Sequence, residues 1–503
     1  MEGTTLLFTL CTSAFILLAT VAFNMAGGLS RPSGAYIFSY TVLAGLFGVA
    51  YKAFLGEPGQ SNLQQPERTI EAYAATALAL LFATYVTHKL LPKRALFPNF
   101  SSNETLGHAA NACLAIGLLT WVYLTFFTPT DSLGRQESGS LASALGQFNY
   151  FALLGMLMSI IYEIRRTGGR RSMNLTGYLA AFYLFATGVL GYSKQGIFTP
   201  FACWFFTAAS QRYRISLLQI AGLIAAGGFV VYYLVPYSQY GRSYGRNDQS
   251  FAQNVQVSLY FLSHLEEVRV TYKQQAQTSV ETRDLVVLYY NHPQGLADRL
   301  TMIPPDDALI NATENGGEFG IFPTLFSFEN LIPHVIWRSK PTIGFSNIYG
   351  HEAGIIGNPE DTTTGIAFSP AGEAYHQAKW VGLLVIYPLL LIMMFFTADL
   401  CFGDTRESPF SLLLLIVLLH IAPEGGITIL TRISFQMIPV IFVIGFLCVR
   451  VFPLLSRAFS VRKTPVLSPF IAAAVQHPRQ ETAEPATAPA AAPYRWSNAA
   501  SRE

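Results

Sequence analysis

The sequence predicts an all-α polytopic membrane protein with about 11 transmembrane helices and one long outer loop that contains helical segments. Of its 503 residues, 51% are hydrophobic and only 12% are charged, against roughly 25% charged in an average soluble domain. Apolar runs of about 20 residues recur along the chain, and each is long enough to cross a hydrocarbon core about 30 Å thick. Basic residues also collect in alternate loops, which is typical of a chain that crosses a bilayer repeatedly.

The candidate spans are apolar runs bounded by charged residues, Pro or Gly. They cover residues 4–26, 34–55, 70–91, 107–127, 146–164, 175–192, 196–211, 214–235, 380–400, 410–422 and 427–452. The runs at 196–211 and 410–422 are shorter than about 17 residues, so re-entrant or broken helices are alternatives there.

These spans divide the chain into four parts. Residues 1–235 form an N-terminal membrane region with about eight spans, and residues 379–452 form a C-terminal membrane region with about three. Residues 236–378 form the long outer loop. Residues 453–503 become rich in Ala and Pro, a composition that buries too little apolar surface to order itself. We expect a disordered cytoplasmic tail.

The orientation follows from the short loops, because Lys and Arg accumulate on the cytoplasmic side. One set of alternate loops contains ten basic residues: Arg31, Lys93, Arg94, Arg165, Arg166, Arg170, Arg171, Arg212, Arg214 and Arg406. The opposite set contains three: Arg68, Arg135 and Lys194. The sequence therefore places the N-terminus and the long loop outside and the C-terminus inside.

The long loop holds much of the polar chemistry, with 15 acidic and 8 basic residues and a net charge of −7. Within it, residues 251–275 place apolar side chains at helical spacing, so we expect one amphipathic helix. Such a helix packs on the membrane region or lies at its surface; a ligand-binding face is the alternative.

Two charged groups lie at the outer ends of spans. Lys194 stands between two apolar runs, where a Lys is expensive unless it is paired or faces water; the alternative is a snorkelling Lys in a tight loop. Glu424 and Arg432 flank the next outer turn. They predict either a local salt bridge or a polar pocket that faces the long loop.

Basic residues in the long loop are candidates for binding phosphate, because Arg forks match its oxygens in a bidentate geometry. Aromatic neighbours would stack on sugar rings. A solvated or carboxylate-paired side chain is the alternative for each one. The candidates are Arg242, Arg246, Arg299, His334, Arg338 and Lys340.

Acids and histidines gather late in the loop. Glu373 precedes the ninth span by seven residues, a position suited to a general base that acts on a membrane-bound acceptor if burial raises its pKa. His351 and Glu352 begin like a zinc-protease helix, but Ile355 stands where that motif needs its second His. The sequence predicts no metal and no cofactor.

The late loop resembles that of bacterial oligosaccharide repeat-unit polymerases, the Wzy-type proteins of O-antigen and exopolysaccharide assembly, within the O-antigen ligase-like superfamily. The residues that carry the resemblance are Ile332 and Pro333, Trp337 to Pro341, Gly344, Asn347, Gly372 to Tyr375 and Trp380 to Gly382, with Ser193 to Gly196 between two spans. The resemblance covers the architecture of about 450 residues and motifs of about 60.

The resemblance implies a metal-independent glycosyltransferase of the bacterial inner membrane that acts on its periplasmic face. It would polymerise undecaprenyl-pyrophosphate-linked oligosaccharide, in contact with membrane lipid, with a polysaccharide chain-length regulator as an optional partner and no nucleic acid. Arg338 and Lys340 would hold the pyrophosphate, and Glu373 would position or deprotonate the acceptor hydroxyl. Arg299 is the second predicted catalytic residue, and the other bases above, with Arg432, would bind pyrophosphate or glycan.

Two alternatives remain at this level. An O-antigen ligase, which transfers finished glycan to a lipid A core or a protein, shares the architecture. A non-enzymatic polysaccharide transporter or flippase would place ionisable residues near the middle of its spans. The predicted spans are nearly free of such residues, which favours catalysis at the outer face.

Overall fold

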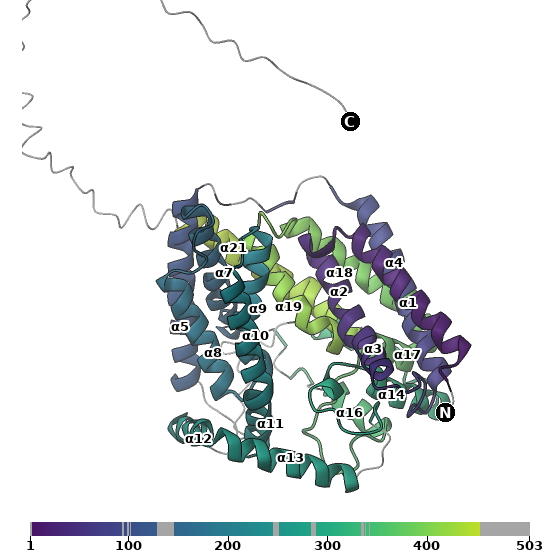
Figure 1. Ribbon diagram of the computed structural model, residues 1–503. Coiled ribbons are helices and arrows are strands. Elements are labelled where there is room, and N and C mark those ends of the chain that lie inside the picture. Colours follow the sequence, from purple (N-terminus) through teal and green to yellow (C-terminus); the bar gives the residue numbers. More distant parts are fainter. Residues whose placement is uncertain are drawn as a thin grey trace, which may run out of the picture. The chain divides into compact units, whose positions relative to one another are not determined.

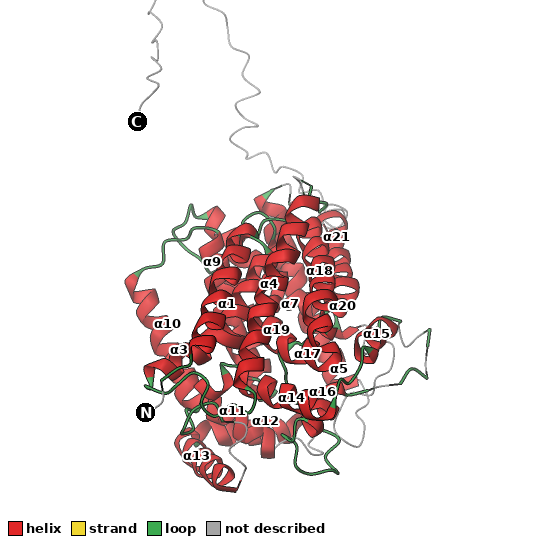
Figure 2. Cartoon of the chain, turned by 90° about the vertical axis from the view of Figure 1, so that its right-hand side faces the viewer, coloured by secondary structure: helices red, strands yellow, loops and turns green. Residues whose placement is uncertain are grey.

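The structure is a computed structural model that describes residues 3–92, 95–97, 100, 102–127, 145–244, 251–282, 288–332, 336–337, 339–341 and 343–452. These residues are almost entirely helical and include no strand (Figure 2). A single bridge pairs Phe368 with Gly425. The all-helical prediction is therefore confirmed for this part of the chain, and the predicted tail, 453–503, lies outside it.

The helices fall into three groups in chain order (Figure 1). The first comprises α1 (Leu6–Met25), α2 (Pro32–Ser39), α3 (Phe47–Phe54), α4 (Pro66–Leu90), α5 (Asn103–Phe127), α7 (Asn149–Arg166), α8 (Leu175–Leu190), α9 (Lys194–Ser210), α10 (Leu217–Phe229) and α11 (Val235–Tyr244). The second comprises α12 (Phe251–Ser263), α13 (Leu265–Thr282), η5 (Ala297–Arg299), α14 (Ile303–Gly316), α15 (Phe322–Glu329), α16 (Phe345–Glu352) and α17 (Pro370–Val381). The third comprises α18 (Tyr387–Phe402), α19 (Pro409–Glu424), α20 (Thr428–Arg432) and α21 (Ile438–Phe446).

Short π-helical turns join several of these helices into longer ones. They are η2 (Tyr40–Leu46), η3 (Val230–Leu234), η6 (Gly382–Ile386), η7 (Ile433–Met437) and η8 (Leu447–Val451). A helix satisfies its backbone polar groups within the segment, which is what an apolar environment demands of a spanning element.

Each of the eleven predicted runs lies on helix in the structure, and seven helical stretches are long and apolar enough to cross a membrane. They are Leu6–Met25, Pro32–Phe54, Pro66–Leu90, Asn103–Phe127, Leu217–Arg242, Pro370–Phe402 and Thr428–Val451. Leu175–Leu190 and Pro409–Glu424 are shorter apolar helices. A polytopic membrane protein is thus supported, with seven spans that meet this criterion among the described residues.

Two predicted boundaries are corrected. The helical stretch Pro370–Phe402, which contains the ninth predicted span, begins ten residues before that span, so Glu373 lies within it. It is broken at Ala378 and Lys379, where the backbone leaves helical geometry. The single helix predicted over 251–275 is two helices, α12 and α13, separated at His264. In both places the apolar periodicity is right, but it does not report where the backbone turns.

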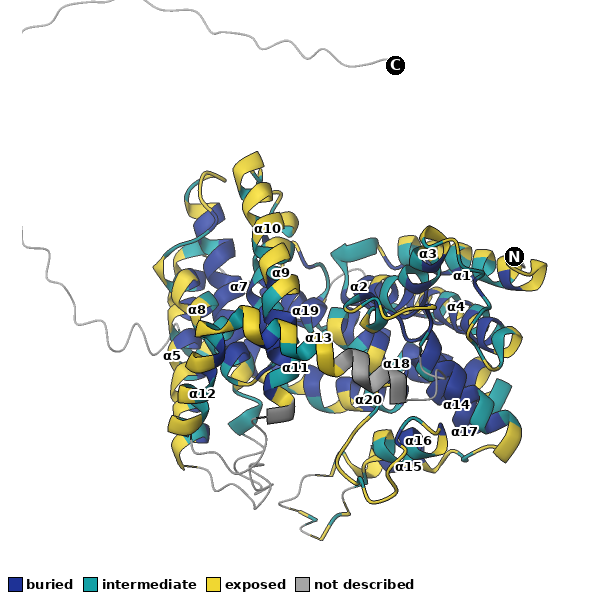
Figure 3. Ribbon diagram, turned by 60° about the horizontal axis from the view of Figure 1, so that its bottom comes forward, coloured by how far each residue is buried: buried dark blue, intermediate teal, exposed yellow. Residues whose placement is uncertain are grey.

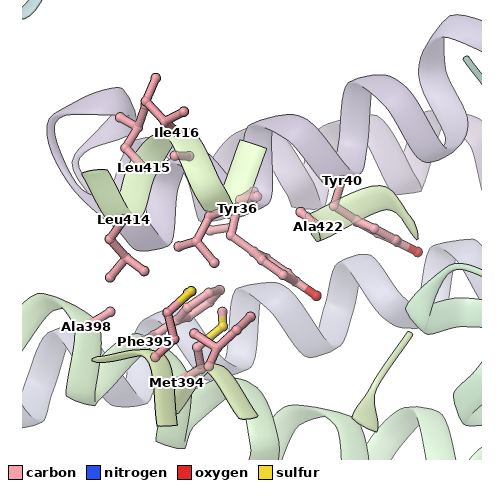
Figure 4. Close-up of a cluster of buried hydrophobic side chains, with 14 of the residues drawn as sticks. Tyr36, Tyr40, Met394, Phe395, Ala398, Leu414, Leu415, Ile416 and Ala422 are labelled. Carbon is pink, nitrogen blue, oxygen red and sulfur yellow. The ribbon is translucent and has the colours of Figure 1, made fainter. Parts of the chain in front are cut away.

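The helices α7 and α19 form the interior of the bundle, and most of their residues are buried (Figure 3). Next to α19, Tyr36 of α2 packs against Phe395 of α18, with ring centroids 5.8 Å apart, in a buried core that also contains Tyr40 and Met394 (Figure 4). The tyrosine hydroxyls are satisfied there, because the Tyr40 hydroxyl donates to Thr76 Oγ1 at 3.0 Å.

Several loops that the basic-residue count places on one side contact one another. Thr405 N donates to the Ser30 carbonyl at 2.9 Å. Gln211 donates through Nε2 to the Arg406 carbonyl at 2.9 Å and accepts through Oε1 from Arg165 Nε at 3.1 Å. These bonds join loops before α2, after α7, after α9 and before α19, so the grouping of these loops is consistent with the structure.

Two adjacent buried carboxylates on α14 tie the long loop to the membrane helices. Asp307 accepts from Gln64 N, Gln65 N and Thr69 Oγ1 at the start of α4. Asp306 accepts from the Tyr73 hydroxyl at 2.7 Å. It also accepts from Ser369 N and Ser369 Oγ at the start of α17. Helix α14 thereby links α4 to α17.

The stability of this link should depend on pH. Burial raises the pKa of Asp306 to about 7, despite the hydrogen bonds that it accepts. A carboxyl whose pKa is higher in the folded state favours folding while it is protonated, and this contribution is lost as the pH rises from about 4 to about 7. We expect Asp306→Asn to flatten the pH dependence of the unfolding midpoint of detergent-solubilised protein across that range. An unchanged slope would contradict this assignment.

Candidate functional site

Three of the predicted basic residues come together from three separate segments. Lys194 begins α9, Arg242 lies near the end of α11 and Arg299 ends η5. The charges of Arg242 and Arg299 act on the Lys194 ammonium, and the carboxylate of Glu424 acts on it with the opposite sign. Lys194 is half-buried, whereas the other three residues are exposed. We call Lys194, Arg242 and Arg299 the basic cluster, with Glu424 as its neighbouring acid.

The position of Lys194 is set by the turn between α8 and α9. Ser193 caps α9, and its hydroxyl accepts from Gly196 N at 3.1 Å. The two helices cross with Gly188 against Gly196, and a Cβ on either glycine would press on the backbone of the other. The close crossing fixes the first turn of α9, which carries Lys194.

Tyr192 joins this turn to α11 and α12. Its φ of +47° lies in the left-handed region, which residues other than glycine rarely adopt. Its carbonyl accepts from Ser238 Oγ at 2.5 Å and from Arg242 Nε at 2.9 Å, and its hydroxyl accepts from Ser258 Oγ at 3.1 Å. Gly241 lies against its ring, where there is no room for a Cβ. Tyr192 therefore holds the Lys194 turn and Arg242 in one arrangement.

Most other described bases on this side are already neutralised or bonded by the protein. The ion pairs are Arg68 with Glu71, Lys379 with Glu314 and Arg269 with Glu266. By contrast, the side chains of Lys194 and Arg299 form no ion pair or hydrogen bond with any residue that the structure describes. Two cations that the protein itself leaves unpaired, beside a third, favour the binding of an anionic ligand.

Glu373 is buried, with 5% of its surface exposed, and it holds the turn that carries Glu424. Its Oε2 accepts from Ile427 N at 2.7 Å, and its Oε1 accepts from Gln377 Nε2 at 3.1 Å. Gly426, with φ of +61°, lies against this carboxylate and leaves no space for a side chain. This geometry favours a positioning role for Glu373, since both of its oxygens already accept protein donors.

Two further predicted residues lie apart from these contacts. Arg432 is exposed on α20, and its charge acts on Tyr150 of α7. Lys340 donates to the carbonyls of Asn330 and Ile332, so it closes its own loop. Three other predicted residues lie outside the described part of the chain: Arg246, His334 and Arg338.

A groove with a cavity volume of about 400 Å³ lies beside the basic cluster, between α11, α12 and α13. Tyr240, which lines it, precedes Arg242 by two residues on α11. The lining combines aromatic rings with amide, carboxylate and hydroxyl groups. It consists of Tyr240, Gln256, Val257, Tyr260, Phe261, His264, Glu267, Val268 and Thr271.

One late-loop histidine, the buried His376, forms a separate network with Thr313 and the exposed Glu352. Thr313 Oγ1 donates to the Leu309 carbonyl at 2.8 Å, so at the 2.9 Å contact with His376 the Nδ1 must be the donor. His376 Nε2 then faces Glu352 Oε2 at 2.9 Å. Burial raises the pKa of Glu352, which favours a proton between these two groups.

Sequence reasoning identified the members of the basic cluster but missed the residues that position them. Tyr192, Ser238 and Ser258 carry no motif of their own. The signals that were present are the glycines at 188, 196 and 241, because a Gly inside an apolar helix often marks a close approach of another group.

Comparison of the chain with protein-family models, with curated proteins and with solved structures finds no significant match.

The contact between Gly241 and Tyr192 can be tested by adding one methyl group. We expect Gly241→Ala to destabilise the protein by about 1–3 kcal/mol, because the new Cβ overlaps the Tyr192 ring. The measurement is the thermal unfolding midpoint of the purified protein in detergent. Gly222→Ala on α10 is the matched control, since nothing lies within 4 Å of a Cβ there. Equal behaviour of the two variants would argue against the contact.

Proposed function

We propose that the chain is a metal-independent glycosyltransferase of the bacterial inner membrane that polymerises undecaprenyl-pyrophosphate-linked oligosaccharide repeat units on the periplasmic face. The observation that carries this proposal is the basic cluster, in which the side chains of Lys194 and Arg299 form no hydrogen bond or ion pair with a described residue. The proposal includes a membrane crossing by all eleven predicted helical segments, with the N-terminus and the long loop outside.

The basic cluster suits a diphosphate. Guanidinium groups bind phosphate oxygens in a bidentate geometry, and an ammonium adds a compact charge. Lys194 also begins a 17-residue helix, whose N-terminal dipole favours an anion. Negative charge develops on the leaving diphosphate as its bond to the sugar breaks. Cations already held in place stabilise that charge with little reorganisation.

The adjacent groove suits the sugars. Tyr240, Tyr260 and Phe261 offer ring faces, while Gln256 and Glu267 offer hydrogen-bonding groups. Aromatic faces with a few polar groups form the kind of lining that holds and orients a ligand. Tyr192 connects the two, because its carbonyl accepts from Arg242 Nε and its ring lies 6.5 Å from that of Phe261 in the groove lining. A glycan in the groove would therefore continue into a diphosphate at the cluster.

The transfer itself needs a base for the acceptor hydroxyl. The hydroxyl oxygen forms a bond to the anomeric carbon, the bond from that carbon to the carrier diphosphate breaks, and the hydroxyl proton passes to a carboxylate. Glu424 is exposed and interacts electrostatically with Lys194. Glu373, buried behind the same turn, would position it. We therefore assign proton transfer to Glu424 and positioning to Glu373.

One prediction of this proposal concerns the basic cluster. We expect Lys194→Ala and Arg299→Ala each to lower polymer synthesis by about 10²-fold to 10³-fold, because each removes a cation from the leaving group. The measurement is a glycan gel from a gene-deletion strain that carries each variant at matched membrane levels.

The matched controls are Lys340→Ala and Arg269→Ala. Lys340 donates to carbonyls of its own loop, and Arg269 pairs with Glu266. Both are bases of the long loop outside the cluster. Normal polymer from both cluster variants, or an equal loss in both controls, would contradict the site.

The deletion strain separates the proposed function from its alternatives. Accumulation of single repeat units on the carrier supports a polymerase. Full-length polymer that stays on the carrier would instead indicate a ligase, and failure of repeat units to reach the periplasm would indicate a flippase.

Another prediction of this proposal distinguishes the roles of Glu424 and Glu373. We expect Glu424→Gln to abolish polymer while leaving the unfolding midpoint nearly unchanged, because its side chain is exposed. Glu373→Gln should lower the midpoint, because its amide would place a donor against Ile427 N or Gln377 Nε2. Activity that survives Glu424→Gln at normal protein levels would refute the assignment of the base.

A further inference from the structure

A second cavity lies at the opposite ends of the helices from the long loop. It has a volume of about 190 Å³ and lies between the end of α1, the start of α2, the end of α4 and α18. A water molecule occupies roughly 30 Å³, so the space is large enough for a small organic group. Neither the basic cluster nor the groove beside it shares a lining residue with this cavity.

The cavity contains a buried hydroxyl without a partner. Thr87 is 3% exposed, and its Oγ1 forms no hydrogen bond within the described structure. One turn earlier, the hydroxyl of Thr84 donates to the Leu80 carbonyl at 2.8 Å, as is usual for a helical Thr. A buried polar atom without a partner costs free energy. The Thr87 hydroxyl therefore indicates a ligand that would form a hydrogen bond with it.

The cavity also contains charges of both signs. Asp399 is buried, and its Oδ2 accepts from Ser33 Oγ at 2.6 Å. Arg31 lies 3.9 Å from the same oxygen, too far for a hydrogen bond, and is partly exposed. His88 lines the cavity from the end of α4 and is also exposed. The acid is thus deep in the cavity, and the bases lie nearer the surface.

The apolar part of the lining and its surroundings suit a lipid. Met25, Leu91 and Phe395 line the cavity, and Phe395 also packs against Tyr36 with ring centroids 5.8 Å apart (Figure 4). On α4, Leu90, which precedes the lining residue Leu91, is exposed. Exposed apolar side chains on a spanning helix face acyl chains, so a lipid has direct access to this place.

We infer that this cavity binds the headgroup of a zwitterionic phospholipid with a primary ammonium, of the phosphatidylethanolamine class. The ammonium lies against Asp399, the Thr87 hydroxyl and the ring of Phe395, and the phosphate lies between Arg31 and His88. A purely anionic headgroup would meet the buried carboxylate, and a simple cation would meet the two bases. This inference is independent of the proposed function.

The experiment uses the full-length protein in detergent and measures retained lipid by native mass spectrometry. The probes are phosphatidylethanolamine, phosphatidylcholine and phosphatidylglycerol with the same acyl chains. Phosphatidylcholine has the same charges but no N–H donors, and phosphatidylglycerol has no cation. We expect the wild-type protein to retain phosphatidylethanolamine most strongly.

Two variants test the contacts. Thr87→Val keeps the shape but removes the hydroxyl, and we expect it to weaken retention of phosphatidylethanolamine about fivefold. Asp399→Asn should remove the preference over phosphatidylglycerol. Thr187→Val is the control, because the Thr187 hydroxyl bonds to carbonyls of its own helix.

The result that would overturn the inference is equal retention of phosphatidylethanolamine and phosphatidylglycerol by the wild-type protein. Retention of phosphatidylethanolamine by Thr87→Val at the wild-type level would overturn it too, and this variant decides the matter if Asp399→Asn fails to fold.

Discussion

Buried carboxylates that accept hydrogen bonds from neutral donors hold helices α14 and α17 of the long loop against α4 and the turn after α19. Asp307 binds the start of α4, Asp306 binds Tyr73 and Ser369, and Glu373 binds Ile427 in the turn after α19. Burying a carboxylate is costly unless donors replace the lost water. Backbone N–H and hydroxyl groups supply those donors here. Each carboxylate therefore fixes the distance between two elements that are far apart in sequence.

The candidate site depends on this chain of contacts. Glu373 lies on α17, whose first residues are held by Asp306 through Ser369. The same Glu373 holds the turn that presents Glu424. The acid beside the basic cluster is thus positioned through α4, α14 and α17 in succession. On the other side, Tyr192 positions Lys194 and Arg242 by hydrogen bonds alone. The two halves of the site are held by hydrogen bonds, and the side chains of Lys194 and Arg299 form no hydrogen bond or ion pair with a described residue.

Sequence patterns predicted the helices well because apolar length is a local property. The run at 4–26 became Leu6–Met25, and the run at 107–127 became Asn103–Phe127. Patterns also identified Lys194 as a candidate, since a base near the end of an apolar span is unusual, and Arg242 and Arg299 as bases of the long loop that suit phosphate. They did not predict the break at Lys379 or the division at His264. The break at Lys379 follows carbonyls that accept from a distant segment, since Phe319 N and Gly320 N donate to the His376 and Gln377 carbonyls.

Burial explains why the role of Glu373 could not be read from the sequence. Its place before an apolar run is equally compatible with an exposed base and with a buried acceptor. The deciding contact is with Gly426, whose missing side chain makes room for the carboxylate from a segment more than 50 residues away. A glycine there admits a carboxylate, and the carboxylate in turn fixes the glycine's left-handed backbone. Packing therefore separates the two carboxylates: both oxygens of Glu373 accept hydrogen bonds from the protein, whereas Glu424, in the turn that Glu373 holds, stays exposed.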